Sequence, residues 1–179
     1  MKIILSGNAG SGKTTIGNIL SEILSTEFLS VGNITRKIAE ERGMDIYEFQ
    51  KYLKSNPDFD IELDKMIVEK VIKLPKYILD YRLGFHFLPE SFKVLLTVSD
   101  EVAFKRTVNR NQQGDNHSND DIKTVRRKMI ERNTMMRDRF IVLYKADFSD
   151  PMNYNLVLDS DVKSPQQIVE EIMSKIEKI

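Results

Sequence analysis

The sequence of 179 residues contains no cysteine and only two histidines, His86 and His117. The lack of cysteine excludes disulfide bonds and thiolate metal sites, and two scattered histidines disfavour a zinc site. No apolar run approaches the length of about 20 residues that a membrane-spanning helix needs. The opening MKIILSG has neither the apolar core nor the cleavage site of a signal peptide. These absences predict a soluble cytoplasmic protein with no membrane partner.

Net charge is also absent, because Lys plus Arg and Asp plus Glu each number 27. A zero balance gives no support for nucleic acid or a membrane surface as the main partner, so we expect small-molecule substrates. The length suits one domain with its own hydrophobic core. We therefore expect residues 1–179 to form a single domain, and the protein to be a monomer.

The stretch GNAGSGKTT directly follows the apolar residues Ile3–Leu5. It fits the phosphate-binding pattern G-x-x-x-x-G-K-S/T, with the fixed places taken by Gly7, Gly12, Lys13 and Thr14. Glycines allow the backbone to turn so that successive N–H groups point into one hollow. A helix that begins near Lys13 adds its free N–H groups and positive dipole end. The alternative, a chance glycine-rich hairpin or helix cap, is disfavoured because the motif lies between a strand pattern and a helix pattern.

The whole motif is predicted to bind nucleotide phosphates: Gly7, Asn8, Ala9, Gly10, Ser11, Gly12, Lys13, Thr14 and Thr15. Lys13 would bring a mobile positive charge to the β- and γ-phosphates. The hydroxyl of Thr14 would be a ligand for Mg²⁺, a cation that keeps most of its waters and binds phosphate oxygens. Thr15 either touches the α-phosphate or only caps the helix.

Hydrophobic periodicity predicts an α/β fold, with a mostly parallel five-stranded sheet and helices on both of its faces. The expected strands are residues 2–6, 28–31, 76–84, 92–99 and 154–160. The expected helices are residues 13–24, 32–43, 45–56, 57–74, 100–111, 120–144 and 164–179. Three helices in a row interrupt the alternation and predict a helical insert over residues 33–74. The polar stretch 111–120 predicts a lid loop.

Polar side chains stand at the ends of the expected strands, where ligands bind in parallel sheets. They are Ser30, Asp80 and Arg82. A carboxylate beside a phosphate-binding loop can hold Mg²⁺ directly or through water. We therefore predict that Asp80 is a metal ligand, against the alternative that it only caps a turn.

Arginines crowd the expected helix 120–144. Its apolar stripe consists of Ile122, Val125, Met129, Met136 and Phe140. Arg132 and Arg139 border that stripe, which favours a place beside a cleft, where guanidinium groups stabilise a migrating phosphoryl group. Arg126 and Arg127 are interpreted as solvent-facing residues paired with nearby carboxylates.

The order of these features resembles the nucleoside monophosphate kinases, and within them the short archaeal-type cytidylate kinases. The segments that carry the resemblance are LSVGNITRKIAEERGMDIYEFQKYLKSNPDFDIELD, ILDYRLG and IERNTMMRDRF. The resemblance covers nearly the whole chain. The P-loop is common to many families, so residues 30–64 and 80–84 are its specific part.

The resemblance implies an ATP- and Mg²⁺-dependent kinase and assigns roles to individual residues. Lys13, Arg82, Arg132 and Arg139 would be catalytic, the last two closing from the lid over the transferring group. Arg36 and Arg82 would bind the acceptor's phosphate, with Ser30 near the acceptor. Arg106 and Arg110, four residues apart on one helical face, would lie by the adenine and the phosphates of ATP.

Three positions depart from the family pattern. Asn33 stands where an aspartate is usual, and Tyr81 replaces the glycine before Arg82; neither change is expected to affect catalysis. Met136 replaces an acidic residue, and methionine cannot accept the amino group of cytosine. Either Asp60 and Asp64 bind the acceptor's base instead, which we expect, or base selectivity is relaxed.

The sequence thus predicts phosphoryl transfer from ATP to CMP or dCMP. One alternative is a kinase of another small molecule: another nucleoside monophosphate, dephospho-coenzyme A or a hydroxy acid. The other is a nucleotide-dependent switch or binding module. The helical insert and the arginines supplied by the chain itself disfavour a switch, since switches commonly receive an arginine from a partner.

Overall fold

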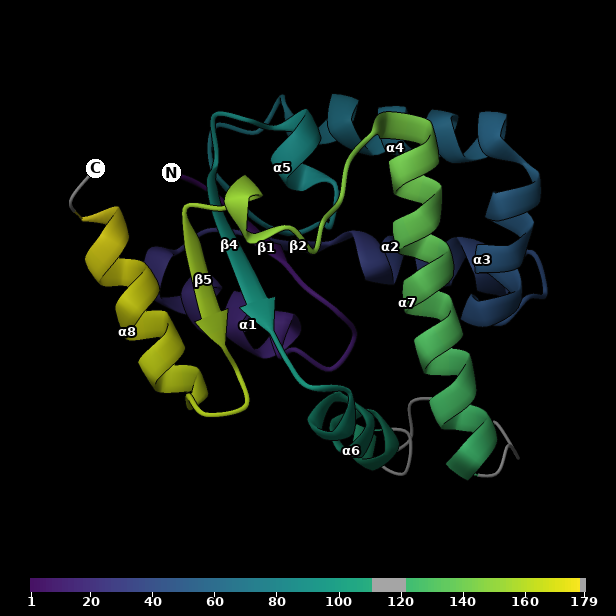
Figure 1. Ribbon diagram of the computed structural model, residues 1–179. Helices are drawn as coiled ribbons and strands as arrows, with labels where there is room; N and C mark the ends of the chain where they lie inside the picture. The colour runs from purple at the N-terminus through teal and green to yellow at the C-terminus, as the bar shows by residue number, and fades with distance from the viewer. Residues whose placement is uncertain (111–121, 178–179) are drawn as a thin grey trace.

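The computed structural model describes residues 1–110 and 122–177, without the side chains of Arg110 and Ile122. The expected lid loop 111–120 lies outside the described residues. Within them, five strands form one sheet in the order β2-β3-β1-β4-β5, and every pair is parallel (Figure 1). The strands are β1 (Lys2–Ser6), β2 (Phe28–Ser30), β3 (Tyr77–Asp80), β4 (Phe92–Thr97) and β5 (Leu156–Asp159). The predicted α/β class is confirmed, and the sheet is parallel throughout.

Seven of the described helices agree with the expected ranges to within a few residues at each end, whereas the short helices at residues 84–87 and 151–153 have no counterpart among the expected ones. The helices are α1 (Lys13–Leu24), α2 (Val31–Glu41), α3 (Ile46–Ser55), α4 (Pro57–Val71), α5 (Gly84–Phe87), α6 (Asp100–Arg110), α7 (Ile122–Tyr144) and α8 (Pro165–Ile176), with a short 3₁₀ helix, η2, at Pro151–Asn153. None of these helices, as far as the structure describes them, combines the length and apolarity that crossing a membrane demands.

The third strand is shorter than expected, because it ends at Asp80 instead of continuing to residue 84. Asp80 pairs with Leu5, one residue before β1 ends, so little of a partner strand remains beyond it. The chain then turns into the short helix α5. A Cβ on Gly84 would lie 2.7 Å from the side chain of Ile4, so only glycine allows α5 to approach the sheet this closely.

Two hydrophobic clusters pack against opposite faces of the sheet. On one face, β-strand residues such as Leu5 and Leu96 pack against Leu20 of α1 and Ile172 of α8, all fully buried. On the other, Ile4 belongs to a cluster that also contains side chains of α3, α4 and α7. Because period-2 alternation sends neighbouring residues to opposite faces, β1 serves both clusters and is the central strand.

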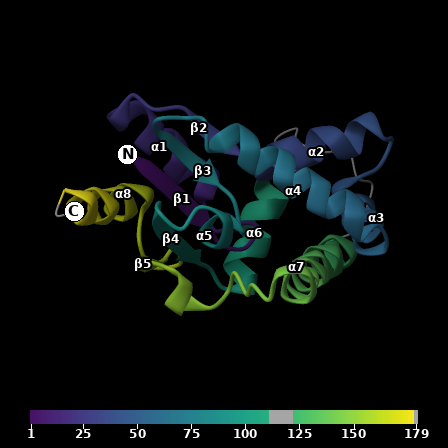
Figure 2. The same cartoon turned by 90° about the horizontal axis from the view of Figure 1, so that it is seen from above.

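Helices α2, α3 and α4 form the predicted insert, which projects to one side of the sheet, where α7 lies beside α3 (Figures 1 and 2). A capping box formed by Asp45 and Glu48 begins α3. Tyr47 donates a hydrogen bond to Glu131 of α7, and Lys128 lies 3.8 Å from Asp45. These polar contacts fasten the insert to α7.

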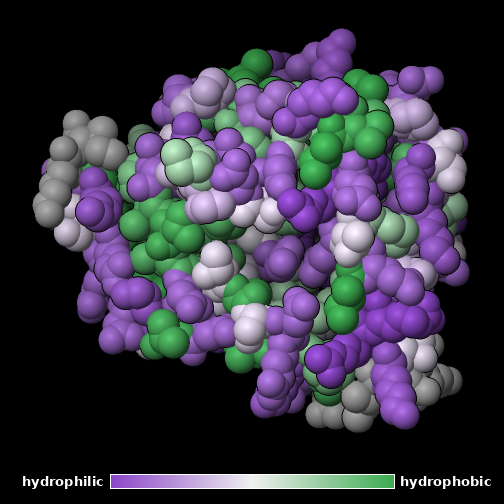
Figure 3. Space-filling model, in the orientation of Figure 1, coloured by the Kyte–Doolittle hydropathy of each residue, from purple (hydrophilic) through white to green (hydrophobic). Residues whose placement is uncertain are grey.

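The sheet is less completely covered near β5. Figure 3 shows apolar side chains gathered over β4 and β5 on the face seen in Figure 1. Val157 of the edge strand β5 is exposed there. Its neighbours Leu156 and Leu158 belong to the cluster on the opposite face, so the alternation of β5 leaves Val157 facing outward.

Candidate active site

The loop between β1 and α1 has a backbone that glycine alone can adopt without strain. Gly7, Gly10 and Gly12 have φ values of +136°, +83° and +86°. A Cβ on Gly7 would lie 2.2 Å from the carbonyl oxygen of Leu96. Gly12 is the N-cap of α1, and no side chain of the described residues caps that helix. The first-turn N–H groups of α1 therefore stay available to an anion.

Lys13 is folded back over this loop and is 7% exposed. Its Nζ donates to the carbonyl oxygens of Gly7 and Asn8 at 2.8 Å each, and to Oγ of Ser11 at 3.3 Å. The ammonium group is thus held at the hollow of the loop. The contact between Lys13 and nucleotide phosphates stays a prediction.

A single cavity of about 550 Å³ runs from this loop to the helical insert. That volume suits a small-molecule site. The predicted site residues that line it are Ala9, Gly10, Gly12, Lys13, Thr14, Thr15, Arg36, Asp60, Asp64, Asp80, Arg82, Arg106, Arg132 and Arg139. Four others, Gly7, Asn8, Ser11 and Ser30, are not among the lining residues, although the first three belong to the loop itself.

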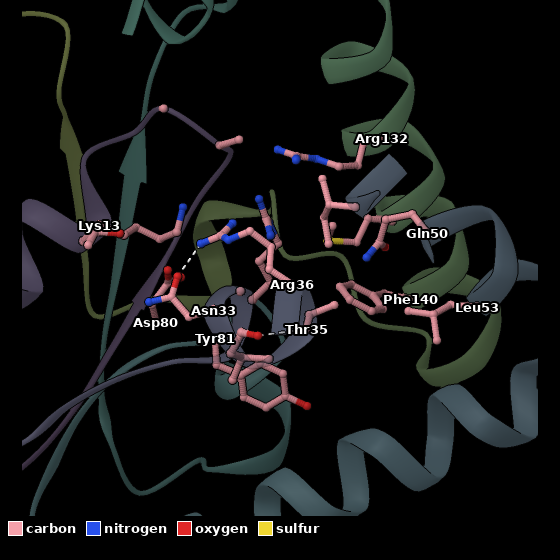
Figure 4. Close-up of a pocket in the computed structure, with 18 of the residues that line it drawn as sticks. Lys13, Asn33, Thr35, Arg36, Gln50, Leu53, Asp80, Tyr81, Arg132 and Phe140 are labelled. Atoms are coloured by element: carbon pink, nitrogen blue, oxygen red, sulfur yellow. Dashed lines mark hydrogen bonds between the residues drawn. The ribbon is translucent and has the colours of Figure 1, made fainter. Parts of the chain in front are cut away.

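The ends of β2 and β3 meet at the middle of the cavity. Ser30 pairs with Asp80 in the sheet register, and its hydroxyl donates to Oδ2 of Asp80 at 3.3 Å. The same hydroxyl accepts from the N–H of Asn33 and caps α2. Arg36, also in the cavity wall, donates to the side chain of Asn33 (Figure 4). Asn33, the first departure from the family pattern, therefore positions a predicted phosphate ligand.

Arg82 follows β3 directly and lines the middle of the cavity. Its guanidinium carbon lies 5.4 Å from the centre of the Phe148 ring. Its Nε is buried and has no hydrogen-bond partner among the described residues. Burial lowers the pKa of Arg82, and the nearby carboxylate of Asp80 opposes that shift. A buried cation with an unused donor is suited to binding an anion.

The residues proposed for Mg²⁺ lie in one cavity wall. Thr14 exposes its side chain at the start of α1, and Asp80 faces the same space from β3. No group of three or more metal-ligating side chains occurs among the described residues. This arrangement fits a Mg²⁺ ion that arrives with a nucleotide, since Mg²⁺ typically takes one or two protein oxygens and completes its shell with phosphates and waters.

Helices α3, α4 and α7 contribute a buried polar group to the far half of the cavity. Nε of Arg139 lies 2.6 Å from Oδ2 of Asp60, and its Nη1 donates to Oε1 of Gln50 at 2.9 Å. Burial raises the pKa of Asp60 to about 6, although Arg139 opposes the shift. Apolar side chains surround this group, among them Leu53, Met136 and Phe140.

A second buried carboxylate is held by two tyrosines. The hydroxyls of Tyr81 and Tyr144 donate to Oδ1 and Oδ2 of Asp64 at 2.7 and 2.9 Å. Burial raises the pKa of Asp64, and both hydrogen bonds oppose that shift. Tyr81 is the second departure from the family pattern, and its ring stacks on Phe87. The substitution therefore supplies a partner for Asp64.

The arginines differ in where the structure places them. Arg106 donates to the carbonyl oxygens of Gly10 and Ser160, at 3.1 and 2.7 Å, so it connects the P-loop to the end of β5. Arg132 extends from α7 into the cavity (Figure 4). Arg139, also on α7, pairs instead with Asp60 and Gln50 of the insert. The side chain of Arg110 lies outside the described residues, so its predicted contact stays a prediction.

Gln50 is the site residue that sequence reasoning missed. It is 3% exposed although it is polar, and it occupies the buried face of α3 with Leu53 three positions later. A polar residue at an apolar-face position was the available signal. Its partner Arg139 comes from a distant helix, so the pairing itself could not be inferred from local spacing.

The chain is similar in sequence and in fold to several known proteins. The chain matches a family model described as an AAA domain over residues 3–126. It is 40% identical over 178 residues to the S-adenosylmethionine-dependent nucleotide dehydratase of Lacinutrix mariniflava, covering 99% of this chain and 36% of that protein. The chain therefore spans little more than a third of that relative.

Similarity also extends to proteins of nearly the same length. The chain is 32% identical over 161 residues to the cytidylate kinase of Methanothermobacter thermautotrophicus, covering 90% of this chain and 96% of that kinase. A solved structure of the shikimate kinase from Acinetobacter baumannii, in complex with shikimate, has a TM-score of 0.60 at 17% identity, covering 99% of this chain and 93% of the other. The similarity to the shikimate kinase shows the fold alone.

Proposed function

The chain belongs to the cytidylate kinase family of P-loop kinases, and we propose that it transfers the γ-phosphoryl group of ATP to a nucleoside monophosphate, with CMP or dCMP as the preferred acceptor. The observation that carries the proposal is one continuous cavity with two unlike halves. The P-loop half offers backbone N–H groups and Lys13. The insert half offers apolar lining residues, among them Leu53, Met136 and Phe140, and the buried polar group of Gln50, Asp60 and Arg139.

In the proposed reaction, an oxygen of the acceptor's phosphate attacks the γ-phosphorus of ATP. A new P–O bond forms, the bond from the γ-phosphorus to its bridging oxygen breaks, and ADP leaves with that oxygen. Catalysis by this chain consists of alignment and charge stabilisation. Lys13 would neutralise the β- and γ-phosphates, while Arg36 and Arg82 would hold the acceptor's phosphate.

Two further features complete the proposed site. Mg²⁺ bound with ATP would add positive charge at the transferring group, with Thr14 and Asp80 as the protein oxygens nearest to it. Arg132 reaches the cavity from α7 and would add a permanently charged donor there. Exclusion of water would protect ATP from hydrolysis until an acceptor is bound.

The insert half of the cavity, which would hold the acceptor's base, supports a cytosine acceptor. Cytosine presents an amino donor next to two acceptors, N3 and O2. Asp60 is the better-placed partner for the amino group, since both oxygens of Asp64 already accept from tyrosines. Met136 would then be part of the apolar wall against the ring, which explains how the family's acidic residue can be absent there.

An acceptor panel tests this proposal. ADP release from Mg·ATP would be measured alone and with CMP, dCMP, UMP, AMP, GMP, shikimate or dephospho-coenzyme A. We expect turnover only with nucleoside monophosphates, and the highest kcat/KM with CMP or dCMP. A purine monophosphate as best acceptor would contradict the cytidylate assignment. Turnover with a non-nucleotide alone, or steady ATP hydrolysis without any acceptor, would contradict monophosphate kinase activity.

A further inference from the structure

Gln50 is a buried amide in the wall of the cavity. It projects from α3 into the half that the insert forms (Figure 4), and its side chain is next to the apolar residues Leu53 and Phe140. Its Nε2 donates to no other residue that the structure describes, while its Oε1 accepts from Arg139. A buried amide normally uses both of its ends. The arrangement therefore leaves donor capacity for a ligand.

The contact with Arg139 fixes which way the amide faces. A guanidinium group donates hydrogen bonds and cannot accept them, so the atom of Gln50 that faces Arg139 must be the oxygen. Arg139 is itself held by Asp60 at 2.6 Å. A flip of the Gln50 amide would place an N–H group against the N–H of Arg139. The amide is locked with its nitrogen as the free end.

We propose that Gln50 is a specificity-determining residue of the acceptor site, a locked donor that reads N3 of cytosine while Asp60 accepts from the neighbouring amino group. This inference rests on the proposed function. A locked amide matters because cytosine and uracil differ in hydrogen-bond direction at the two neighbouring positions. Cytosine has an acceptor at N3 and an amino donor at position 4. Uracil has an N–H at position 3 and an acceptor oxygen at position 4.

With uracil in the same place, both contacts would be repulsive. The N–H group at position 3 would face the donor of Gln50, and the oxygen at position 4 would face the carboxylate of Asp60. An amide that was free to rotate would remove the first conflict by turning its oxygen to the base. Arg139 prevents that rotation. Discrimination would therefore come from unpaired or opposed polar groups, which distinguish ligands more sharply than an apolar wall does.

The test compares Gln50→Glu and Gln50→Met with the wild-type chain. Gln50→Glu offers an acceptor in place of the donor and still provides a partner for Arg139. Gln50→Met removes the donor at similar size. Gln166→Glu, on the exposed surface of α8, is the matched control for added charge. The measurements are kcat/KM for CMP and UMP, KM for ATP, and the thermal unfolding midpoint of each variant.

We expect the ratio of kcat/KM for CMP to that for UMP to fall about tenfold or more in both Gln50 variants, with KM for ATP unchanged and the control equal to wild type. An unchanged ratio in a folded variant would overturn the inference, and so would equal use of CMP and UMP by the wild type. Either result leaves monophosphate kinase activity standing. Wild-type protein that turns over no monophosphate would overturn both the inference and the proposed function.

Discussion

Arg139 and Asp60 form an ion pair inside the protein, with 2.6 Å between Nε and Oδ2 and side-chain exposures of only 7% and 3%. The pair joins α7 to α4 across the acceptor half of the cavity. Charges at such depth lose most of their hydration, so each depends on the other and on Gln50. This contact therefore links the stability of the insert to the chemistry of the site.

Removing one member of the pair should cost more than replacing both. We expect Arg139→Met to lower the free energy of unfolding by about 3–5 kcal/mol, because it leaves a buried carboxylate without a counter-charge. The double variant Arg139→Met, Asp60→Leu should recover most of that loss. Urea unfolding of the two single variants and the double variant measures this coupling. Additive losses would contradict it.

Titration of Asp60 should make the free energy of unfolding depend on pH. Burial raises its pKa from 3.8 to about 6, with Asp64 adding to the shift and Arg139 opposing it. The folded-state pKa lies above the unfolded one, so protonation of Asp60 stabilises the folded protein. This contribution to the free energy of unfolding is fully present below pH 3.8 and is lost as pH rises through about 6. The size is about 3 kcal/mol for a shift of this order.

The experiment is urea unfolding of the wild type and Asp60→Asn at several values between pH 4 and pH 7.5. The difference between the two proteins isolates Asp60 from other titrating groups. Asp147 shifts in the opposite direction, because Arg137 lowers its pKa, and it acts alike in both proteins. A difference that stays constant over this range would show that Asp60 titrates as an ordinary carboxyl.

Local patterns were the part of the fold that the sequence could predict. The P-loop follows from residue spacing within one short stretch of the chain, and the helix ranges follow from local periodicity. The strand order could not be predicted, because periodicity reveals which residues alternate and not which strands pair. The short helix α5 was missed for a related reason: its position depends on the approach of Gly84 to Ile4.

The site residues show the same difference between local patterns and contacts of distant segments. The helical period predicted that Arg139 borders a cleft, and its side chain is buried there. Which half of the cleft it occupies depends on Asp60 and Gln50, which belong to other helices. Gln50 lies between Phe49 and Lys51 and belongs to no chemical motif. Its role becomes visible only through its contact with Arg139, which is distant along the chain.

Lys13→Ala tests the P-loop directly. We expect kcat to fall at least about 100-fold, since removal of one preorganised charge at a developing anion has effects of this size. The fold should persist, because the hydrogen bonds of Lys13 to Gly7, Asn8 and Ser11 lie within the P-loop and outside the two hydrophobic clusters. Lys73→Ala, on the exposed end of the insert, is the control. Near-normal kcat in Lys13→Ala would refute the predicted role.

Arg82→Lys tests the phosphate site of the acceptor. Lysine keeps the charge but loses the forked geometry that grips a phosphate with two parallel hydrogen bonds. We expect KM for CMP to rise about tenfold or more while KM for ATP changes little. Arg126→Lys, on an exposed part of α7, should leave both constants unchanged. A rise in KM for ATP alone would place Arg82 in the other half of the cavity.

Tyr81 replaces the glycine that is usual in the family, and its hydroxyl donates to Asp64. Substitutions at this position test what the replacement contributes. Tyr81→Phe keeps the ring on Phe87 and deletes one hydrogen bond to Asp64, so it should cost about 1 kcal/mol of unfolding free energy. Tyr81→Gly, which restores the family's residue, should cost about 3–5 kcal/mol, because it also leaves a cavity where the buried ring was. Urea unfolding measures both.

A comparison of Tyr81→Phe with Tyr144→Phe separates a supporting role of Tyr81 from a catalytic one. Tyr81 contributes its hydroxyl to Asp64 and not to the phosphate half, so Tyr81→Phe should keep kcat with CMP close to the wild-type value. Tyr144→Phe removes the other hydrogen bond to Asp64 and serves as the matched variant. A large loss of kcat in Tyr81→Phe, with Tyr144→Phe still active, would mean that Tyr81 takes part in the reaction itself.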